Sequence, residues 1–584
     1  MSISMKFGGD LSISLLDVPL SLLRHCSSVR KKQLGNTFLL MCLSGLTESL
    51  TVGAVLPFIG ALVSPEKLLE NYYFGELASF FSLTSAFDVQ SFITVVFCVI
   101  AIFATIVRLT LVKMTANSAR DIGSDFHIKV FRQTLNRPFL DHLSQNSSVV
   151  QAGLKKVDRL AANFILPLLS IFTSLISILA VMTLLAFVQP VATLVVVIGF
   201  GLIYGLISYR SKALLITKGE IIARDSIRLF QLVQESLGSI RDIKLADTEN
   251  FHIEKYSKVT RNVQSALAVS QLIANLPKHL VEGFGIVLLA LLSFLFISSG
   301  NSLLNLLPIL GTFALGAHRI LPMLNNVYSS FSVLLAELPN VRDILDIVKQ
   351  DVVKKPGRLN TNREEAMFND SIYLRDICFK YPSTNKNLLR KLNLKIKRGQ
   401  IIGLMGQSGS GKSTVTNILL GLLKPDDGDV LIDGKRLGKD VSFDWWFSVI
   451  THVPQSVFLI DDTISRNITL SKPGEVIDYQ KLKSVSKVCL VEDFIKNWDH
   501  ELDTLVGENG ARLSGGQRQR IGIARALYTG ANLLVLDEAT NALDTRSERR
   551  LMRNLKSAYP NITMLIVSHE KEKLERLCDF IYEL

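Results

Sequence analysis

The sequence predicts a chain of two parts, in which an α-helical membrane domain of six spans is followed by an α/β domain with a phosphate-binding loop. Three observations support this prediction. Of the 584 residues, 48% are apolar and the mean hydropathy is positive, a balance that favours a membrane-embedded part. Apolar stretches long enough to cross a bilayer lie before residue 335. Beyond residue 340 the chain becomes charged, with glycine-rich turns and short β-like runs.

Each of the six apolar stretches has the length of about 20 residues that a bilayer-spanning helix needs. Prolines within these stretches are expected to kink the helices at Pro57, Pro167, Pro308 and Pro322. The stretches run near 37–63, 89–113, 163–187, 190–209, 280–299 and 303–330.

The domain boundaries follow from shifts in composition. Near the N-terminus, Asp17 interrupts an apolar stretch and basic residues follow it, which is the reverse of a signal peptide and favours an amphipathic helix at the cytoplasmic membrane surface. A polar stretch with Pro356 and Gly357 indicates a linker. The predicted parts are an amphipathic segment, a transmembrane domain, a linker and a nucleotide-binding domain, at residues 1–33, 34–335, 336–369 and 370–584.

The distribution of charge predicts the orientation in the membrane. The segments 114–162 and 210–279 are rich in Lys and Arg, whereas 64–88 has one lysine and four acidic residues. By the positive-inside rule, both chain ends and the two long loops are expected in the cytoplasm. The net charge of +12 comes without a basic stripe interleaved with aromatic residues, so no nucleic-acid partner is expected. The six cysteines have no metal-site spacing and are interpreted as packing residues.

The strongest local motif is a glycine-rich phosphate-binding loop. It follows the β-like run 401–405 and opens the helical run 415–423, which is the context that this motif requires. Its glycines allow backbone N–H groups to face phosphate oxygens, and the helix N-terminus adds its positive dipole end. Lys412 is expected to reach the β- and γ-phosphates and Ser413 to hold Mg²⁺. The loop consists of Gly406, Gln407, Ser408, Gly409, Ser410, Gly411, Lys412, Ser413 and Thr414.

Two carboxylates end a second β-like run at 533–536. Asp537 fits a ligand of Mg²⁺ and its water, and Glu538 fits the general base that polarises the attacking water. Upstream, Leu513-Ser514-Gly515-Gly516-Gln517 resembles the signature of the ABC transporter family. Further family motifs follow in order, and they imply ATP and Mg²⁺ as cofactors. By this resemblance, Tyr381 stacks on adenine, Gln455 is the glutamine that senses Mg²⁺, Ser514, Gly515, Gly516 and Gln517 contact ATP, Asp544 lies in the D-loop, and His569 is the switch histidine.

The resemblance also implies a partner. In this family the signature of one subunit closes over ATP held by the phosphate loop of the other, so one copy of each motif implies two chains and two composite sites. A homodimer is the simplest expectation, and a heterodimer with a similar half stays open. Pro138–Leu143 and Asp247–Tyr256 are candidates for the short helices that couple the two domains. The chain ends inside what reads as the last strand, where the family usually adds a turn and a helix.

Four ionisable residues fall within the predicted spans: Glu48, Arg108, Glu282 and Arg319. Each costs about 2.5–3.5 kcal/mol against lipid at the bilayer centre, so each is expected to face a cavity, a partner helix or the membrane interface. Arginine suits phosphate because its guanidinium binds in a planar fork. The alternative for Arg108 and Arg319 is structural pairing with Glu48 or Glu282.

The transmembrane part resembles bacterial lipid-linked oligosaccharide flippases of the PglK type, on the runs 281–285 and 318–322 and on the aromatic-rich outside segment Asn71–Leu83. This resemblance implies an ATP hydrolase of the bacterial inner membrane that flips a lipid-linked glycan by alternating access, with Arg108, Arg319 and Glu282 at the substrate. The alternatives are export of drugs, peptides or lipid A-like lipids, a non-transporting ATPase, and a binding protein that has lost hydrolysis. The six predicted spans argue against a non-transporting ATPase, and Glu538 argues against a protein that has lost hydrolysis.

Overall fold

The computed structural model describes residues 17–63, 65, 81, 85–144, 147–188, 190–298, 303–349, 368–382, 387–471 and 475–584. The chain divides into two compact units. The first contains residues 1–137 and 144–352, and the second contains 138–143 and 353–584. Residues 1–16 of the predicted amphipathic segment and 350–367 of the predicted linker lie outside the described residues.

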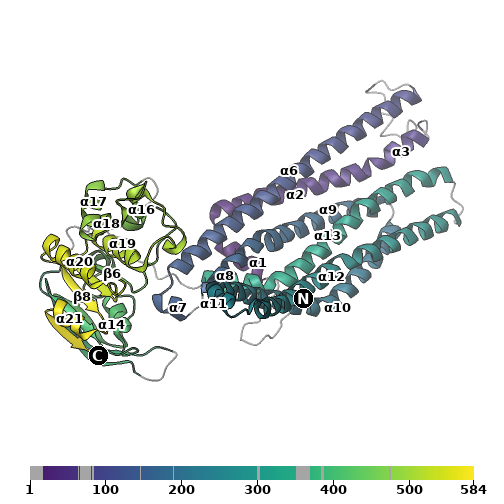
Figure 1. The fold of residues 1–584 in the computed structure, drawn as a ribbon. Coiled ribbons are helices and arrows are strands. Elements are labelled where there is room, and N and C mark those ends of the chain that lie inside the picture. The colour runs from purple at the N-terminus through teal and green to yellow at the C-terminus, as the bar shows by residue number, and fades with distance from the viewer. Residues whose placement is uncertain are drawn as a thin grey trace. The chain divides into compact units, whose positions relative to one another are not determined.

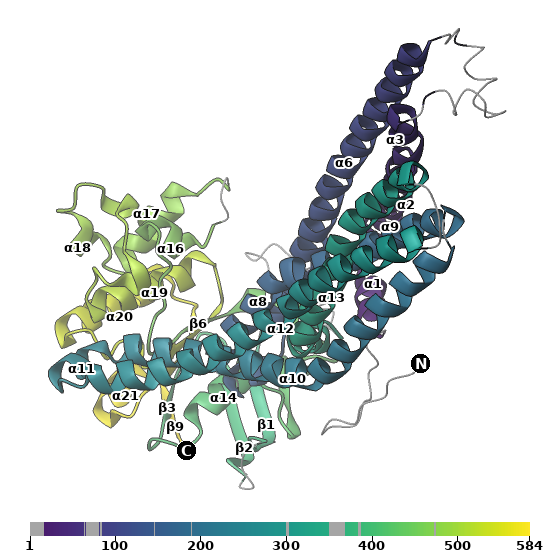
Figure 2. The same cartoon turned by 90° about the vertical axis from the view of Figure 1, so that its right-hand side faces the viewer.

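The first unit is built of long helices that lie side by side, as Figures 1 and 2 both show for α2 and α6. Within the described residues, four helical segments are long and apolar enough to cross a membrane: Ser28–Val63, Ala86–Leu135, Gly153–Val188 and Thr193–Gly238. They overlap the first four predicted spans, and α12 and α13 cover the fifth and sixth. The elements are α1 (Asp17–His25), α2 (Ser28–Gly53), α3 (Val55–Val63), α6 (Ala86–Leu135), α8 (Ser147–Leu160), η1 (Ala161–Ile165), α9 (Leu166–Val188), α10 (Pro190–Gly238), α11 (Ile240–Leu245), α12 (Glu249–Ser298) and α13 (Leu303–Lys349).

Two boundaries of the first unit differ from those read in the sequence. Helix α2 begins at Ser28 with Ser27 as its N-cap, so the end of the predicted amphipathic segment belongs to the first long helix. Helix α13 continues to Lys349, through the first part of the predicted linker. The physical reason is a row of apolar residues at helical spacing that packs into the core, including Leu338, Val341 and Leu345.

Breaks in the helices lie near two of the predicted proline kinks. Helix α2 ends at Gly53 and α3 begins at Val55, two residues before Pro57. The π-helical turn η1 directly precedes α9, whose second residue is Pro167, a residue that cannot donate a backbone hydrogen bond. No interruption separates Pro322 from its neighbours, because α13 is continuous there.

The second unit holds two sheets with helices packed around them. A four-stranded antiparallel sheet has the order β2-β1-β4-β5, and a five-stranded parallel sheet has the order β6-β7-β8-β3-β9. The strands are β1 (Ser371–Phe379), β2 (Leu389–Lys397), β3 (Ile401–Met405), β4 (Asp427–Ile432), β5 (Lys435–Arg436), β6 (Ile450–Val453), β7 (Leu533–Asp537), β8 (Thr563–Val567) and β9 (Phe580–Glu583). Strands β3, β7 and β8 are largely apolar and buried, as expected for parallel strands covered on both faces.

The helices of this unit are short, and five of them have an N-terminus that is capped by a side chain. Those used below are α14 (Lys412–Leu419), α19 (Gly515–Tyr528), α20 (Thr545–Ala558) and α21 (Lys571–Leu577). The others are α15 (Phe443–Val449), α16 (Ile464–Thr469), α17 (Tyr479–Val488), α18 (Glu492–Ile495), η2 (Glu501–Asp503) and η3 (Glu508–Gly510).

One short helix from the first half of the sequence belongs mainly to the second unit. This is α7 (Phe139–Ser144), of which residues up to Leu143 cluster with the C-terminal domain. Phe139 and Leu140 pack against the apolar core that contains β1, β2 and β3. The predicted coupling segment Pro138–Leu143 is therefore an integral part of that unit. The other candidate, Asp247–Tyr256, forms the start of α12 instead of a separate short helix.

Candidate functional site

The phosphate-binding loop lies between the end of β3 and the start of α14, beside the parallel sheet. Gly409 and Gly411 have φ angles of +82° and +104°, a left-handed region that only glycine enters without strain. Gly411 is also the N-cap of α14 and offers no side-chain cap. The first backbone N–H groups of α14 are therefore directed at the loop, which is the arrangement that binds phosphate.

The residues of this loop fit a bound nucleotide triphosphate. Lys412 Nζ curls back over the loop and donates to the carbonyl oxygens of Gly406 at 2.6 Å and Gln407 at 2.9 Å. The hydroxyl of Ser410 is buried without a partner among the described residues. A cation, a set of directed N–H groups and an unsatisfied hydroxyl in one loop form a donor set suited to phosphate oxygens.

Two carboxylates stand at the end of β7, beside the loop. Burial raises the pKa of Asp537, the neighbouring Glu538 carboxylate raises it further, and the Lys412 ammonium opposes both effects. A buried carboxylate in this setting gains from a divalent cation, which stabilises its charged form. Asp537 and Ser413 both line one cavity, described below, and are the two residues there that could hold the Mg²⁺ expected with ATP.

Glu538 is held at the centre of a clamp made by three other residues. Gln455 Nε2 donates to its Oε2 at 2.7 Å, and Asn541 Nδ2 donates to the same oxygen at 3.3 Å. His569 Nδ1 lies 3.1 Å from its Oε1. The backbone of Glu538 has a φ of +49°, which a non-glycine residue adopts only when its surroundings enforce it. The position of Glu538 after β7 predicts a general base, and the contacts with Gln455, Asn541 and His569 hold its carboxylate in one orientation.

A cavity of about 620 Å³ brings most of these groups together. Of the predicted site residues, most of the phosphate loop, Gln455, both carboxylates and His569 contribute to its lining. Leu388, which precedes β2, also lines it, and no motif identified that residue. The lining residues are Leu388, Ser408, Gly409, Gly411, Lys412, Ser413, Thr414, Gln455, Asp537, Glu538 and His569.

Tyr381 lies at the edge of the phosphate loop. Its hydroxyl shares a hydrogen bond of 3.1 Å with Thr414 Oγ1, and its ring packs edge-on against Phe379 at 5.1 Å between centroids. The tyrosine is therefore anchored to the loop at one end and to the core at the other.

The signature residues do not line this cavity. Ser514 caps the N-terminus of α19, accepting from Gln517 N while Gln517 Oε1 accepts from Ser514 N at 2.8 Å. Gly516 approaches the backbone of Ala542 so closely that a Cβ would lie 2.8 Å from its carbonyl oxygen. The N-terminus of α19 is thus a capped helix end that is separate from the phosphate loop of the same chain.

Asp544 of the predicted D-loop acts as the N-cap of α20. Its Oδ1 accepts from the backbone N–H groups of Arg546 at 3.0 Å and Ser547 at 2.9 Å. Hydrogen bonds from Ser547 and Arg546 lower the pKa of Asp544, so its carboxylate stays charged at the helix end. Asp544 shapes the turn between β7 and α20, and it does not line the cavity around Glu538.

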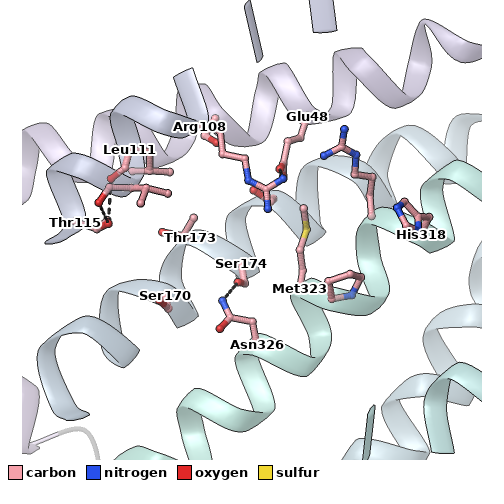
Figure 3. Close-up of a pocket in the computed structure, with 15 residues that line it drawn as sticks. Glu48, Arg108, Leu111, Thr115, Ser170, Thr173, Ser174, His318, Met323 and Asn326 are labelled. Carbon is pink, nitrogen blue, oxygen red and sulfur yellow. Dashed lines mark hydrogen bonds and ion pairs between the residues drawn. The ribbon is translucent and has the colours of Figure 1, made fainter. Parts of the chain in front are cut away.

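A second cavity, of about 400 Å³, lies among α2, α6, α9 and α13 of the first unit (Figure 3). Arg108 and Glu48 approach each other across it, with 3.5 Å between Arg108 Nη1 and Glu48 Oε1. The Glu48 side chain is 8% exposed and the Arg108 side chain 54%. Arg319 lines the same cavity and makes no ion pair within the described part of the chain. Both arginines that the sequence singled out thus face one polar space, and the pairing of Arg108 with Glu48 also holds.

Glu282 lies elsewhere. It does not line this cavity, its side chain is 49% exposed, and its Oε2 lies 3.6 Å from His279 Nδ1. Glu282 was grouped with the arginines because all three lie within predicted spans, but it lies on α12, and no residue of α12 that the structure describes lines the cavity. A substrate role shared with Arg108 and Arg319 in this cavity does not fit Glu282.

A polar face on α9, which no sequence motif identified, forms one wall of the same cavity. Ser170, Thr173, Ser174 and Ser177 recur at spacings of three and four residues, so they share one side of the helix. Asn326 of α13 donates to Ser174 Oγ at 2.9 Å (Figure 3). This spacing in an otherwise apolar stretch was the signal that could have identified the wall.

Two family models match the chain. The model described as ABC transporter transmembrane region matches residues 52–315, and that described as ABC transporter matches residues 389–541. A solved structure, a bacterial Atm1-family ABC exporter with ATP bound, superposes with a TM-score of 0.73 at 20% identity, covering 96% of this chain and 94% of that one. The predicted fold class, a helical membrane domain with an α/β nucleotide-binding domain, is confirmed.

Curated relatives include ATP-dependent lipid A-core flippases. That of Photobacterium profundum is 32% identical over 331 residues, which cover 55% of this chain and 54% of the relative. Those of Yersinia pestis bv. Antiqua (strain Antiqua) and Escherichia coli (strain K12) are 35% identical over 263 residues, which cover 45% of this chain and 44% of each relative. The matched region spans about half the length of these relatives. The chain thus carries, fused on one polypeptide, the membrane and nucleotide-binding domain types of the ABC transporters, and over the matched region it is similar to the lipid A-core flippases.

Proposed function

We propose that this chain is one half of a dimeric, ATP-driven exporter that moves a phosphate-bearing glycolipid across the bacterial inner membrane. The observation that carries the ATP-driven part is the clamp on Glu538 beside the phosphate loop, in a cavity of about 620 Å³. ATP, when bound, would supply the phosphoanhydride bond whose hydrolysis drives the cycle, and Mg²⁺ would neutralise part of the charge on its phosphates.

The residues of the chain have separate tasks in this proposal. Lys412 exchanges its two carbonyl partners for phosphate oxygens, and Ser413 with Asp537 holds the Mg²⁺ site. Glu538 accepts the proton of the attacking water, while Gln455 and His569 keep its carboxylate directed into the cavity. Removal of the proton acceptor alone should abolish hydrolysis and leave the binding of nucleotide intact.

The second subunit follows from the position of the signature. Because Ser514 and its neighbours line no part of the cavity around the phosphate loop, a complete site needs a signature from elsewhere. A second copy of this chain is the simplest source. The test mixes two variants, Lys412→Ala and Ser514→Arg, each inactive as a homodimer. Mixed dimers should recover hydrolysis, because one of their two composite sites contains neither substitution. No recovery, with mixed dimers verified by differently tagged chains, would contradict composite sites.

The cargo class rests on the cavity in the first unit. Arg319 has no ion pair there among the described residues. Arg108 contacts Glu48 through one nitrogen at 3.5 Å, and its side chain stays 54% exposed. Two guanidinium groups are therefore available to an anion. Guanidinium forks bind phosphate, and the hydroxyls of the α9 wall can bind sugar or phosphate oxygens. Two cargo types have this chemistry: lipid A-like lipids, which the names of the relatives favour, and lipid-linked oligosaccharides, which the sequence resemblance favours.

The experiment that tests this function is ATP hydrolysis in proteoliposomes, comparing the wild type with Glu538→Gln. Lipid A, polyprenyl-pyrophosphate glycans and an uncharged glycolipid are added separately. We expect hydrolysis that depends on Glu538 and is stimulated by one phosphate-bearing lipid, with stimulation lost in Arg108→Ala/Arg319→Ala. Stimulation by the uncharged glycolipid alone would overturn the cargo class. Hydrolysis no higher than that of Glu538→Gln would overturn the ATP-driven function itself.

A further inference from the structure

Within the second unit, a series of polar contacts leads from Glu538 away from the nucleotide cavity toward α20 and α21. Asn541 Nδ2 donates to Glu538 Oε2 at 3.3 Å, and Lys573 Nζ donates to Asn541 Oδ1 at 3.0 Å. The Lys573 ammonium also forms an ion pair with Glu548 Oε1 at 2.8 Å. Arg576 lies at the far end, 3.2 Å from Glu548 Oε2. None of the motifs read in the sequence includes Lys573.

The chemistry of Lys573 gives this contact a direction. An ammonium group can only donate hydrogen bonds, so the atom of Asn541 that faces it must be the carbonyl oxygen. The amide NH₂ is then forced to the other side, where it meets the carboxylate of Glu538. The ionised carboxylate of Glu538 can only accept hydrogen bonds, so it favours the same orientation from the other side. Lys573 therefore anchors the far end of the amide that donates to Glu538.

The positions of these residues make the contact a fixed one. The side chains of Lys573 and Glu548 are each only 6% exposed, so the ion pair is shielded from water. Lys573 lies on α21, which follows His569 closely, and Glu548 lies in the first turn of α20. His569 and Asn541, which both contact Glu538, thus lie just before α21 and α20, respectively. A shielded ion pair that spans both helices resists their separation, because moving either helix would leave a buried charge unpaired.

We propose that Lys573 is a positioning residue for hydrolysis, which acts on the general base through the side-chain amide of Asn541. The proposal rests on the function proposed above. Asn541 and Gln455 donate to the same oxygen of Glu538, so an anchored Asn541 helps to fix the orientation of the carboxylate that accepts the proton of the attacking water. Loss of Lys573 leaves Asn541 Oδ1 without its charged donor, so the amide is no longer anchored against Glu538 and their contact weakens.

A purely structural role makes a different prediction. In that case Lys573 serves only to neutralise the buried Glu548, a task that Arg576 shares. Arg576 contacts Glu548 on the oxygen that Lys573 does not use, and its side chain is 39% exposed. Arg576→Met is therefore a matched control for Lys573→Met, because both remove one cation from Glu548 but only one of them releases the amide.

The experiment measures kcat and KM for ATP in proteoliposomes for the wild type, Lys573→Met, Arg576→Met, Asn541→Ala and the double variant Asn541→Ala/Lys573→Met. We expect Lys573→Met to lower kcat about tenfold with KM unchanged, and Arg576→Met to keep the kcat of the wild type. In the Asn541→Ala background, Lys573→Met should have no further effect, because the residue through which it acts is gone. Tryptophan fluorescence of the full chain reports folding of the unit, since all three tryptophans lie at 445, 446 and 498.

Three results would overturn the proposal. The first is an unchanged kcat in Lys573→Met. The second is a fall in kcat on Lys573→Met that is as large in the Asn541→Ala background as in the wild type. The third is an unchanged kcat in Asn541→Asp, a substitution at an exposed position that keeps an acceptor for Lys573 but removes the donor to Glu538. The proposal requires a lower kcat in that variant, so it can be tested even where Lys573→Met fails to fold. Wild-type hydrolysis that does not depend on Glu538 would instead refute the proposed function and is measured first.

Discussion

The contact between α10 and α13 leads to a sharp prediction for the first unit. Gly219 of α10 lies against the backbone of Ala336 in α13. A Cβ at position 219 would lie 2.9 Å from the carbonyl carbon and 3.1 Å from the Cα of Ala336, and closer still to its carbonyl oxygen. These are backbone atoms of a continuous helix, so no side-chain rotation can relieve the overlap. Gly219→Ala must therefore push the two helices apart.

The magnitude follows from two opposing effects. Overpacking of a well-packed contact costs about 1–3 kcal/mol. Replacing glycine by alanine inside a helix stabilises the helix by about 1 kcal/mol. Because the clash is with backbone on a helix whose neighbouring residues are buried in the core, the upper part of the overpacking range applies. We expect a net loss of about 1–2 kcal/mol in the free energy of unfolding of the first unit.

The matched control lies on the same helix. An added Cβ at Gly205 meets nothing within 4 Å, so Gly205→Ala should leave stability unchanged or raise it slightly. Unfolding of the purified full chain in detergent is followed by far-UV circular dichroism for the helices and by tryptophan fluorescence for the second unit. The helical transition of Gly219→Ala should shift down by several degrees while the fluorescence transition does not move. Equal stability of the two variants would refute the close approach of α10 and α13.

Three further predictions concern named contacts. Burial opposes ionisation of Asp433, but hydrogen bonds from the backbone N–H groups of 369–371 lower its pKa overall. The charged carboxylate therefore stabilises the fold at neutral pH, and this contribution is lost as the pH falls through the folded-state pKa. Asp433→Asn should make the free energy of unfolding, followed by tryptophan fluorescence, depend less on pH in the acid range. Burial raises the pKa of Glu337, and the guanidinium of Arg159, 3.1 Å away, opposes that shift. Arg159→Met should therefore lower the free energy of unfolding by about 3 kcal/mol at neutral pH. The loss should be smaller in mild acid, where Glu337 is protonated, and thermal unfolding followed by circular dichroism measures both. Tyr381→Ala should raise the KM for ATP several-fold with little change in kcat, because Tyr381 contacts Thr414 of the phosphate loop and not Glu538; a fall in kcat alone would contradict this assignment.

Motifs whose chemistry depends on adjacent residues were predictable from the sequence. The phosphate loop needs a strand, glycines at fixed positions and a helix start, and all of these are local. The convergence of Gln455, Asn541 and His569 on one carboxylate was not predictable in detail, because it depends on how segments far apart in the chain end at the same edge of the parallel sheet. Lys573 was missed for the same reason, since its role exists only once α21 packs beside the turn after β7.

Two other differences have simpler causes. The extension of α13 to Lys349 was present in the sequence as apolar residues at helical spacing, but the rising share of charged residues and Pro339 concealed it. Glu282 was grouped with Arg108 and Arg319 because charges within apolar stretches attract attention irrespective of which helix they occupy. Hydropathy locates such residues along the membrane normal, but it does not tell which helices face each other.

The placement of residues 138–143 in the second unit has a consequence for biosynthesis. Phe139 and Leu140 leave the ribosome about 440 residues before the unit that shelters them is complete, which at typical translation speeds is an interval of roughly 20–90 s. During that time these two large apolar side chains lack the core against which they pack in the complete protein. Their apolar surface is therefore open to aggregation until the second unit has folded around it.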